Sequence, residues 1–453
     1  MKHLLLLAPI FLIISIVIVI DSEPESVLIT NIKLIDGTGE PARERQSVLI
    51  VDGLIKKISN AQSFQPSKNT EIVDGTGKTM IPGLIGVHNH LHIPRHPFIG
   101  KIASKLYLAS GVTTIQTAGA AYPYEEIELA KQIELREFIG PEIIPSGPYI
   151  TGDGGNPNMI IPQDESALRD TIRYWANKGA KWIKVYRNVD PNFLEVVIEE
   201  AHNNNMKVTG HLCSITFQEA SDLGIDAIEH GFNSVSDFRE GKEYGKCSGS
   251  RNYIDELPLD AKEVDELLQL LINNGTVLTS TLSIYEASIP SRSYLDVRSI
   301  TVMSDTFRGN FKDLNENRYT KKDVSELRER RLKRIMEFEY RFYKMGGILA
   351  AGVDAGRHIL PGFGDQRNFQ LLLEAGFSVE EAIHIMTKNG AVKLGRDDIG
   401  TIEIGKKADF VLLEGDLKKN EDVIHNVNEV YKNGMSYEPD TILKSILGQY
   451  GLN

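Results

Sequence analysis

The sequence predicts an α/β protein: a (β/α)8 TIM-like barrel that carries a small β-sandwich domain built from both ends of the chain. Three observations lead to this fold. Strand-like and helix-like runs alternate through the middle of the chain, and eight strands can be counted, which is the number in a (β/α)8 barrel. Several of these strands end in His, Lys or Asp, at the end where barrel enzymes build their sites. Short strands with Gly turns occur near both chain ends, which indicates a β unit split around an inserted domain.

The split β unit is defined by its turns. Near the N-terminus, an Asp-Gly or related pair stands beside apolar runs in three segments, VLITNIKLIDGTG, QSVLIVDGLIKKIS and EIVDGTGKTMIPG. Near the C-terminus, strands with Gly turns are again predicted in IGTIEIGKKADFVLLEGD and VNEVYKNGM. We therefore expect residues 23–81 and 396–440 to form the sandwich, residues 82–395 the barrel, and residues 441–453 a C-terminal tail.

Each strand of the predicted barrel follows a turn or a helical run. The strands are Leu84–His90, Thr113–Thr117, Glu142–Pro145, Trp182–Tyr186, Lys207–His211, Ala227–His230, Thr276–Ser280 and Ile348–Asp354. The helices are expected near residues 101–109, 124–139, 164–178, 191–204, 214–223, 261–274 and 321–345. Two insertions, about residues 232–258 and 282–321, follow strand C-terminal ends, where barrel enzymes form substrate pockets.

The charge balance limits the partners. The 453 residues include 50 Lys and Arg against 62 Asp and Glu, a net charge of −12. With no basic stripe to follow a phosphate backbone, nucleic-acid binding is not expected. We expect a small-molecule amide or peptide substrate, and a homo-oligomer is compatible with a sequence that does not specify the oligomeric state.

The first 22 residues predict a signal peptide or an N-terminal anchor. Met1-Lys2-His3 precede an apolar run from Leu4 to Ile20, which is long for a signal-peptide core and short for a transmembrane helix. No Ala-x-Ala site is evident, and no Cys follows that would carry a lipid anchor. We expect export, periplasmic or extracellular, with cleavage near residues 21–25, or a membrane anchor if the segment stays uncleaved.

The two cysteines, Cys213 and Cys247, do not predict a disulfide framework. Cys213 lies two residues after His211, and we interpret it as a small apolar core residue rather than a nucleophile.

Five of the strands end in side chains that bind metals. Alternation along a strand points His88 and His90 to one face, where two imidazoles can chelate a divalent ion. Other strands end in His211, His230 and Asp354, and a buried carboxylate needs a metal or a cation as its partner. Each side chain alone is compatible with a structural role, but five separate coincidences would be needed to explain them all.

The remaining one of these five strands, Trp182–Tyr186, carries Lys184, which is the most discriminating of the candidate metal-binding residues. It lies within an apolar strand, so its ammonium group is desolvated unless it is paired. One interpretation is an internal salt bridge. The other is reaction with CO2, which forms a carbamate able to bridge two metals and is favoured by the lowered pKa of a desolvated lysine.

Seven segments carry recognisable motifs: PGLIGVHNHL, IKVYRN, GHLCS, AIEHGFN, GVDAG, LLLEAGFSVEEAIHIMTKNGAVKLG and IGTIEIGKKADFVLLEGD. Through them, residues 27 to about 435 resemble the amidohydrolase superfamily, in particular its imidazolonepropionase-like or Xaa-Pro dipeptidase-like branch. The resemblance implies two divalent metal ions. His88, His90 and Asp354 would bind the buried ion, His211 and His230 the more exposed one, and carboxylated Lys184 would bridge both.

The chain departs from the family pattern at three places. Gly86 stands where an Asp is usual, residues 151–155 lack the His of a Gly-Gly-His-Gly stretch, and Gln366 and Asn368 replace a His and a Glu. None is a ligand position, so the departures weaken the transfer of a substrate rather than of the metal site.

The predicted function is hydrolysis of a C–N bond in an amide, peptide or cyclic amide. Two metals lower the pKa of a shared water, and Asp354 takes its proton and passes it to the leaving amine. Zinc suits the nitrogen-rich ligand set best, and manganese or iron could occupy it. Residues just beyond strand ends that could contact substrate are Tyr186, Arg187, Asn233, Tyr285 and Arg357, with Arg187 or Arg357 suited to a carboxylate.

Three alternatives stay open. A one-metal deaminase of the same superfamily has no need for a bridging carboxylate, and Lys184 argues against it. An esterase or phosphotriesterase could use the same chemistry. A catalytically silent binding scaffold could share the fold, although the complete ligand set argues against it.

Overall fold

The computed structural model describes residues 26–60, 68–92, 98–250, 253–292, 297–309, 322–356 and 359–452. The predicted leader and Arg357 lie outside the described residues. Within the described ranges, no helix combines the length and hydropathy needed to cross a bilayer.

Strands from both chain ends form one eight-stranded sheet. Its members are β1 (Ser26–Leu34), β2 (Arg43–Val51), β3 (Leu54–Asn60), β4 (Thr70–Asp74), β5 (Lys78–Pro82), β15 (Phe410–Glu414), β16 (Val427–Lys432) and β17 (Met435–Tyr437). The order is β17-β16-β15-β5-β1-β2-β3, with β4 beside β1, and β15 pairs antiparallel with β5. The described strands form a single sheet, so the two facing layers of a sandwich stay a prediction.

Turn chemistry explains the hairpin between β2 and β3. Asp52 and Gly53 both have positive φ, 52° and 72°, which is the backbone of a tight two-residue turn that Asp-Gly favours. The core of this sheet is apolar and includes Phe410, whose ring stacks on Tyr431 at 4.4 Å.

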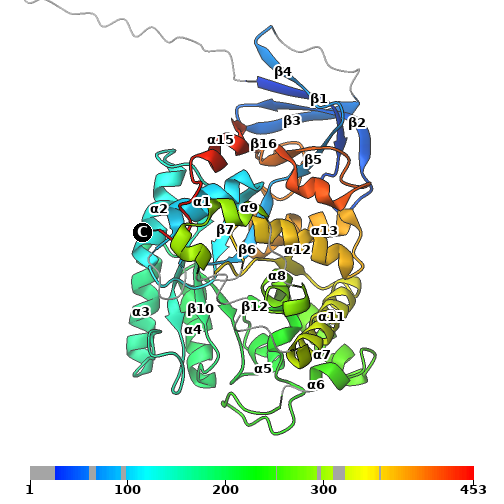
Figure 1. Ribbon diagram of the computed structural model, residues 1–453. Helices are drawn as coiled ribbons and strands as arrows, with labels where there is room; N and C mark the ends of the chain where they lie inside the picture. The colour runs from blue at the N-terminus through cyan, green and yellow to red at the C-terminus, as the bar shows by residue number, and fades with distance from the viewer. Residues whose placement is uncertain are drawn as a thin grey trace, which may run out of the picture.

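The central domain alternates strands with helices. A parallel three-stranded sheet contains β6 (Leu84–Asn89), β7 (Val112–Thr117) and β8 (Glu142–Ile144). A parallel six-stranded sheet contains β9 (Ser146–Ile150), β10 (Trp182–Val185), β11 (Lys207–Gly210), β12 (Ala227–Glu229), β13 (Val277–Ser280) and β14 (Leu349–Ala351). Figure 1 shows α3 and α4 on one side of these strands and α7 and α11 on the other.

The two sheets meet at two seams. The first seam lies between β8 and β9, which are separated by Pro145, a residue that cannot donate a ladder hydrogen bond. Beyond the end of β14, the Asp354 amide donates to the His88 carbonyl of β6 at 2.8 Å. This second contact brings the first and last strands of the domain together beside the predicted ligands.

Helix ends follow ordinary capping. Asp164 caps α3 (Glu165–Lys178) by accepting from the Ala167 amide, and α3 ends at Gly179 with φ 110°. The other helices of the central domain are α1 (Gly100–Ala109), α2 (Pro123–Glu134), α4 (Pro191–Asn203), α5 (Phe217–Asp222), α7 (Lys262–Asn273), α11 (Lys322–Lys344), α12 (Phe363–Glu374), α13 (Val379–Met386) and α14 (Lys388–Leu394).

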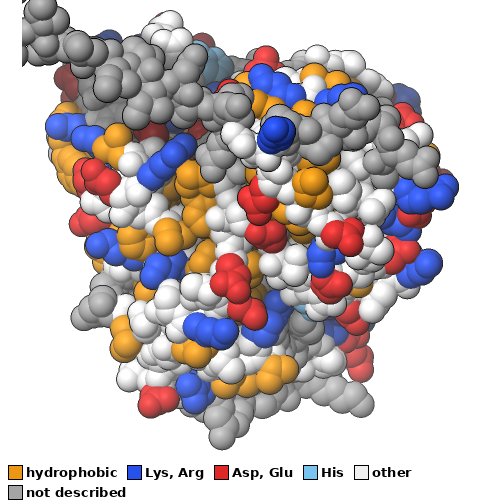
Figure 2. Space-filling view, turned by 90° about the horizontal axis from the view of Figure 1, so that it is seen from above, with side chains coloured by type: hydrophobic (Ala, Val, Ile, Leu, Met, Phe, Trp, Pro, Cys, Tyr) orange, Lys and Arg blue, Asp and Glu red, His pale blue; other side chains and the backbone are white. Residues whose placement is uncertain are grey.

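The predicted insertions contain short helices. The first holds a 3-10 turn at Gly231–Ser234 and α6 (Tyr253–Glu256), and the second holds α8 (Leu282–Glu286), a 3-10 turn at Pro290–Arg292 and α9 (Val297–Val302). The chain end forms α15 (Pro439–Lys444) and then buries Tyr450 against Phe307, with ring centroids 5.2 Å apart. On the face shown in Figure 2, Lys and Arg are interspersed with Asp and Glu rather than gathered into a stripe.

Candidate metal centre

The six predicted ligands share one position, the C-terminal end of a strand of the central domain. They are His88 and His90 at the end of β6, Lys184 in β10, His211 after β11, His230 after β12 and Asp354 after β14. Because the strands run parallel, these ends lie at one edge, and all six side chains line one cavity.

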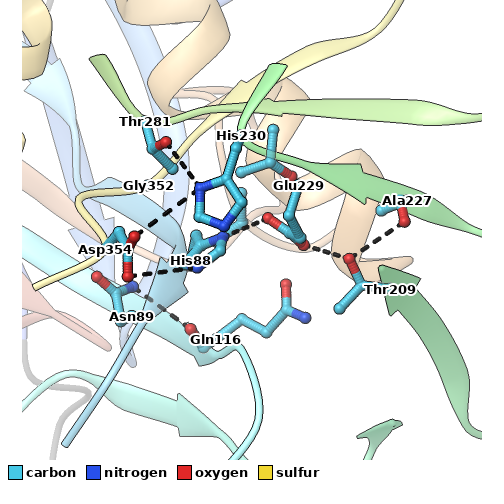
Figure 3. Close-up of polar contacts among 12 residues, drawn as sticks. His88, Asn89, Gln116, Thr209, Ala227, Glu229, His230, Thr281, Gly352 and Asp354 are labelled. Atoms are coloured by element: carbon cyan, nitrogen blue, oxygen red, sulfur yellow. Dashed lines mark hydrogen bonds and ion pairs between the residues drawn. The ribbon is translucent and has the colours of Figure 1, made fainter. Parts of the chain in front are cut away.

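The carboxylate of Asp354 is the centre of the cluster. Its Oδ1 lies 3.0 Å from His90 Nε2 and 3.6 Å from His88 Nε2, and its Oδ2 lies 3.8 Å from His230 Nδ1. The His211 ring lies 4.4 Å from the His230 ring. One ligand atom from each of His88, His230 and Asp354 falls within 4.8 Å of the others, a spacing that one divalent ion can bridge (Figure 3).

Two of the ligands have unusual backbone. His230 has φ 71° and Asp354 has φ 49°, in the left-handed region that side chains with a Cβ rarely adopt. Each residue comes just after its strand, so the left-handed turn re-aims the side chain. Strain of this kind costs of order 1 to 3 kcal/mol per residue and persists at functional sites.

Lys184 is buried without a partner. Its side chain is 1% exposed, and its Nζ has no hydrogen-bond partner among the described residues. Burial lowers the pKa of Lys184 to about 8. A buried amine that nothing satisfies fits a group that becomes charged and bonded only when a carbamate and metals are present.

Burial favours the neutral form of three imidazoles of the cluster, those of His88, His211 and His230. Burial lowers the pKa of His88 to about 4, and the pKa values of His211 and His230 also lie well below the usual histidine value, again mainly through burial. Neutral imidazole is the form that binds metal, so no proton has to be displaced at neutral pH.

Asp354 is held in the opposite state. Burial alone would raise the pKa of its carboxyl, but His88, His90 and His230 together hold that pKa well below the ordinary value. A carboxylate beside nitrogen donors, together with the orphaned Lys184 amine, is a donor set that fits divalent ions.

The cavity over the cluster has a volume of about 600 Å³. Its walls beyond the ligands are His92, Ala118, Ala121, Tyr122, Tyr149, Asn156, Asn158, Met159, Tyr186 and Ala355. The volume falls within the range of pockets that hold small organic ligands.

Comparison with known proteins decides the family. A family model described as "Amidohydrolase family" matches residues 343–437. An enamidase from Eubacterium barkeri is 31% identical over 271 residues, which cover 48% of this chain and 68% of the enamidase. This chain belongs to the amidohydrolase family.

Further relatives and structures agree with that family. An imidazolonepropionase from Alkaliphilus oremlandii is 24% identical over 85% of this chain and 90% of the relative. The first curated relatives are matched over less: the chain spans 39% of a 5'-deoxyadenosine deaminase from Methanococcus maripaludis, at 30% identity. The crystal structure of a Xaa-Pro dipeptidase with bound methionine has the same fold, with a TM-score of 0.68, 21% identity, and coverage of 91% of this chain and 100% of that one. The predicted superfamily and branch are confirmed.

The predicted substrate residues divide between the cavity and its surroundings. Tyr186 lines the cavity and packs on His211 at 4.8 Å. Tyr285 is half-buried and lies near His230, with ring centroids 6.3 Å apart, and hydrogen-bonds with Thr281 and Asn233. Arg187 is not among the described residues that line the cavity, and Arg357 lies outside the described residues.

The cysteine interpretation was wrong. Cys213 and Cys247 form a disulfide across 34 positions of sequence, so Cys213 is not a free core thiol. The insertion after β12 folds back onto the end of β11, a path that spacing alone does not reveal. Arg187 donates toward the disulfide, its Nη2 lying 3.4 Å from Cys247 Sγ, and Arg239 Nη1 lies 3.1 Å from Cys213 Sγ.

Gln366 and Asn368, which depart from the family pattern, have structural roles. Asn368 Nδ2 donates to the Gly352 carbonyl at 2.7 Å, which fixes the backbone two residues before Asp354. Gln366 Nε2 donates to the Ser110 carbonyl at 3.1 Å. A Cβ at Gly86 would lie 2.7 Å from Asn89 Nδ2, so a larger residue at this position would require the Asn89 side chain to move.

Three residues around the ligands were not singled out from the sequence. Thr281 Oγ1 lies 3.1 Å from His230 Nδ1, and Glu229 Oε2 lies 2.5 Å from His88 Nδ1 (Figure 3). The Tyr149 hydroxyl lies 3.0 Å from His90 Nδ1. Such partners fix the orientation of ligating imidazoles. Only Glu229 leaves a signal in the sequence, as an acid within an apolar strand directly before a ligand.

Proposed function

We propose that this chain is a binuclear metal hydrolase that cleaves a C–N bond in a small amide, peptide or cyclic amide. The observation that carries the proposal is the convergence of four histidines, Asp354 and the unpaired Lys184 amine on one cavity. The architecture that we assign to it is a (β/α)8 barrel, closed through the seams at Pro145 and at His88, with a β-sandwich formed by the chain ends.

The metal assignment follows the positions of the donors. His88, His90 and Asp354 would hold one ion, because Asp354 Oδ1 faces the Nε2 atoms of both histidines, at 3.6 and 3.0 Å. His211 and His230, whose rings are 4.4 Å apart, would hold the other. The bound ions, zinc in the first instance, would supply Lewis acidity and lower the pKa of a water.

Lys184 would complete the site as a carbamate. The neutral Nζ attacks the carbon of CO2: an N–C bond forms, the π bond of one C=O opens onto its oxygen, and one proton leaves Nζ for solvent, so that a neutral amine becomes an anion with two donor oxygens. The low pKa of Lys184 supports this step, because a larger fraction of the amine is neutral than for an exposed lysine.

Asp354 would move the proton. Its ionised carboxylate accepts a proton from the attacking water and returns it to the nitrogen of the leaving amine, so that one residue is base and then acid. Tyr149 and Tyr186 would contact the substrate, since both line the cavity beside the histidines. A cavity of about 600 Å³ suits a dipeptide, an N-acyl amino acid or a lactam.

A one-metal deaminase is the second candidate. The similarity to 5'-deoxyadenosine deaminases over part of the chain favours it. The Lys184 amine, which has no hydrogen-bond partner among the described residues, favours the binuclear enzyme, because its carbamate would bridge two ions and a single ion needs no such bridge. An esterase or phosphotriesterase would use the same metal centre. A catalytically silent binding scaffold would not require the metal ligands.

The test compares wild type with Lys184→Ala in metal content and in turnover. We expect two divalent ions per wild-type chain, and hydrolysis of a member of a panel of dipeptides, N-acyl amino acids and lactams. The variant should hold one ion or none and lose at least about a hundredfold in kcat, since the bridging ligand is gone.

The matched control is Lys181→Ala, three positions earlier in the same segment, where the lysine is exposed. It should keep wild-type metal content and turnover. Unchanged metal content in Lys184→Ala would exclude the bridging role, and ammonia release from an aminopurine substrate with one ion per chain would favour the deaminase.

A further inference from the structure

Lys393 is a buried cation that the proposed chemistry does not use. It belongs to α14, the short helix that precedes the last strands of the terminal sheet, yet its side chain is fully buried among the central strands. Its Nζ donates to the Val87 carbonyl at 2.9 Å, to Thr279 Oγ1 at 2.8 Å and to Glu229 Oε1 at 2.8 Å. All three donor hydrogens of the ammonium group therefore have acceptors.

Glu229 connects that cation to the candidate metal centre. One of its oxygens accepts from Lys393 and from the Thr209 hydroxyl, and the other lies 2.5 Å from His88 Nδ1. Figure 3 shows the carboxylate between His88 and Thr209. Glu229 is 0% exposed, and each of its carboxylate oxygens has a hydrogen-bond partner within the protein. These contacts therefore fix the orientation of the carboxylate.

The contacts determine which nitrogen of His88 is available. Nδ1 faces a carboxylate and carries the hydrogen that it donates, so the lone pair is on Nε2. Nε2 is the atom that faces Asp354, at 3.6 Å. The chain of contacts thus presents the basic nitrogen of His88 to the position where an ion would bind.

Lys393 is itself held by surrounding contacts. Its Nζ lies 5.4 Å from the Trp182 ring centroid, and Lys207 Nζ donates to the Lys393 carbonyl at 3.0 Å. Asn389 of the same helix donates to the Leu349 carbonyl at 2.9 Å, which fastens α14 to β14. If the ammonium group swung away, the buried Glu229 carboxylate would lose the cation that is hydrogen-bonded to it, which is strongly unfavourable.

We propose that Lys393 is a positioning residue for the metal centre: it fixes the Glu229 carboxylate against His88 and thereby orients His88 Nε2 toward the buried ion. The inference rests on the proposed metal site. It connects helix α14 to the first predicted ligand of β6, although α14 contributes no ligand of its own. Loss of a partner that orients a ligating histidine typically weakens metal binding about 10- to 100-fold.

The decisive variant is Lys393→Met, which keeps the length of the side chain and removes its charge and donors. Zinc affinity is measured by competition with a chromophoric chelator, and the cobalt-substituted protein is followed by its visible absorption spectrum. We expect about 10- to 100-fold weaker binding of the first ion and a changed cobalt spectrum. Lys388→Met, on the same helix but partly exposed, is the control and should match wild type in both.

A second variant separates positioning from simple loss of stability. Glu229→Gln replaces the buried anion with a near-isosteric neutral group, so Lys393→Met combined with Glu229→Gln no longer leaves an unpaired charge. If Lys393 acts through Glu229, the double variant should lose less affinity than the sum of the two single effects. If Lys393→Met does not fold, Glu229→Gln alone should still show weaker zinc binding and a shifted cobalt spectrum.

The outcomes distinguish this inference from the proposed function. A folded Lys393→Met that keeps wild-type zinc affinity and cobalt spectrum, with or without a lowered melting temperature, would reduce the contact to a structural salt bridge and overturn the inference. Wild-type protein that binds no divalent ion would instead overturn the proposed function.

Discussion

At the scale of single residues, Lys184 constrains the chemistry most strongly, because its amine is buried and no described residue accepts its hydrogens. Only the neutral amine attacks CO2. With a pKa of about 8, the neutral fraction rises about tenfold per pH unit below pH 8 and saturates above it.

Carbamate formation on the metal-free protein should therefore follow that profile. At a fixed concentration of dissolved 13CO2, the rate at which a carbamate signal appears by 13C NMR should rise about tenfold from pH 6 to pH 7 and level off above pH 8. Lys184→Ala should give no signal. A rate that keeps climbing beyond pH 10, as for an ordinary lysine, would contradict the lowered pKa.

Residue patterns predicted the side chains that converge on the cavity but not their partners. An apolar strand ends at or next to each of the residues His88, His90, His211, His230 and Asp354, and this pattern can be recognised from the sequence alone. The Lys393–Glu229 contact joins residues 164 positions apart, and nothing local to either residue indicates the other. Partners of this kind depend on the packing of α14 beneath the strands.

At the scale of elements, strand and helix positions were predicted closely where periodicity was strong. The helix expected at residues 321–345 is α11 (Lys322–Lys344), and the strand expected at Trp182–Tyr186 is β10 (Trp182–Val185). The third strand was predicted as a single segment ending at Pro145, whereas the chain forms β8 and β9 on either side of that proline.

The disulfide between Cys213 and Cys247 belongs to this scale, because it fastens the insertion after β12 to the end of β11. A loop closed across 34 positions should contribute about 3 to 4 kcal/mol by restricting the unfolded chain. Cys247→Ser should lower the free energy of unfolding in urea by about that amount, and dithiothreitol should do the same to wild type. A loss below about 0.5 kcal/mol would show that the insertion is held by its other contacts.

At the scale of the whole molecule, β15 and β5 bring segments from both ends of the chain into one sheet, and Asn389 of α14 donates a hydrogen bond to Leu349 of β14 in the central domain. The split β unit was predicted from turn pairs at both chain ends. The number of layers in this β unit could not be predicted from the sequence, because alternation along a strand does not show which strands lie face to face.

We propose that the mature protein is exported, on the strength of the apolar run at Leu4–Ile20 and of a disulfide that suits an oxidising compartment. N-terminal sequencing of the secreted or periplasmic protein should find a start within residues 21–25. A start at Met1 with membrane retention would instead support the anchor.

The central claim is that six side chains hold two divalent ions in one cavity. Anomalous diffraction at the zinc edge, from crystals grown with zinc and bicarbonate, tests it most directly. We expect two strong peaks, one among His88, His90 and Asp354 and one between His211 and His230, with electron density extending from Lys184 Nζ to both. Peaks elsewhere, or none in that cavity, would contradict the account.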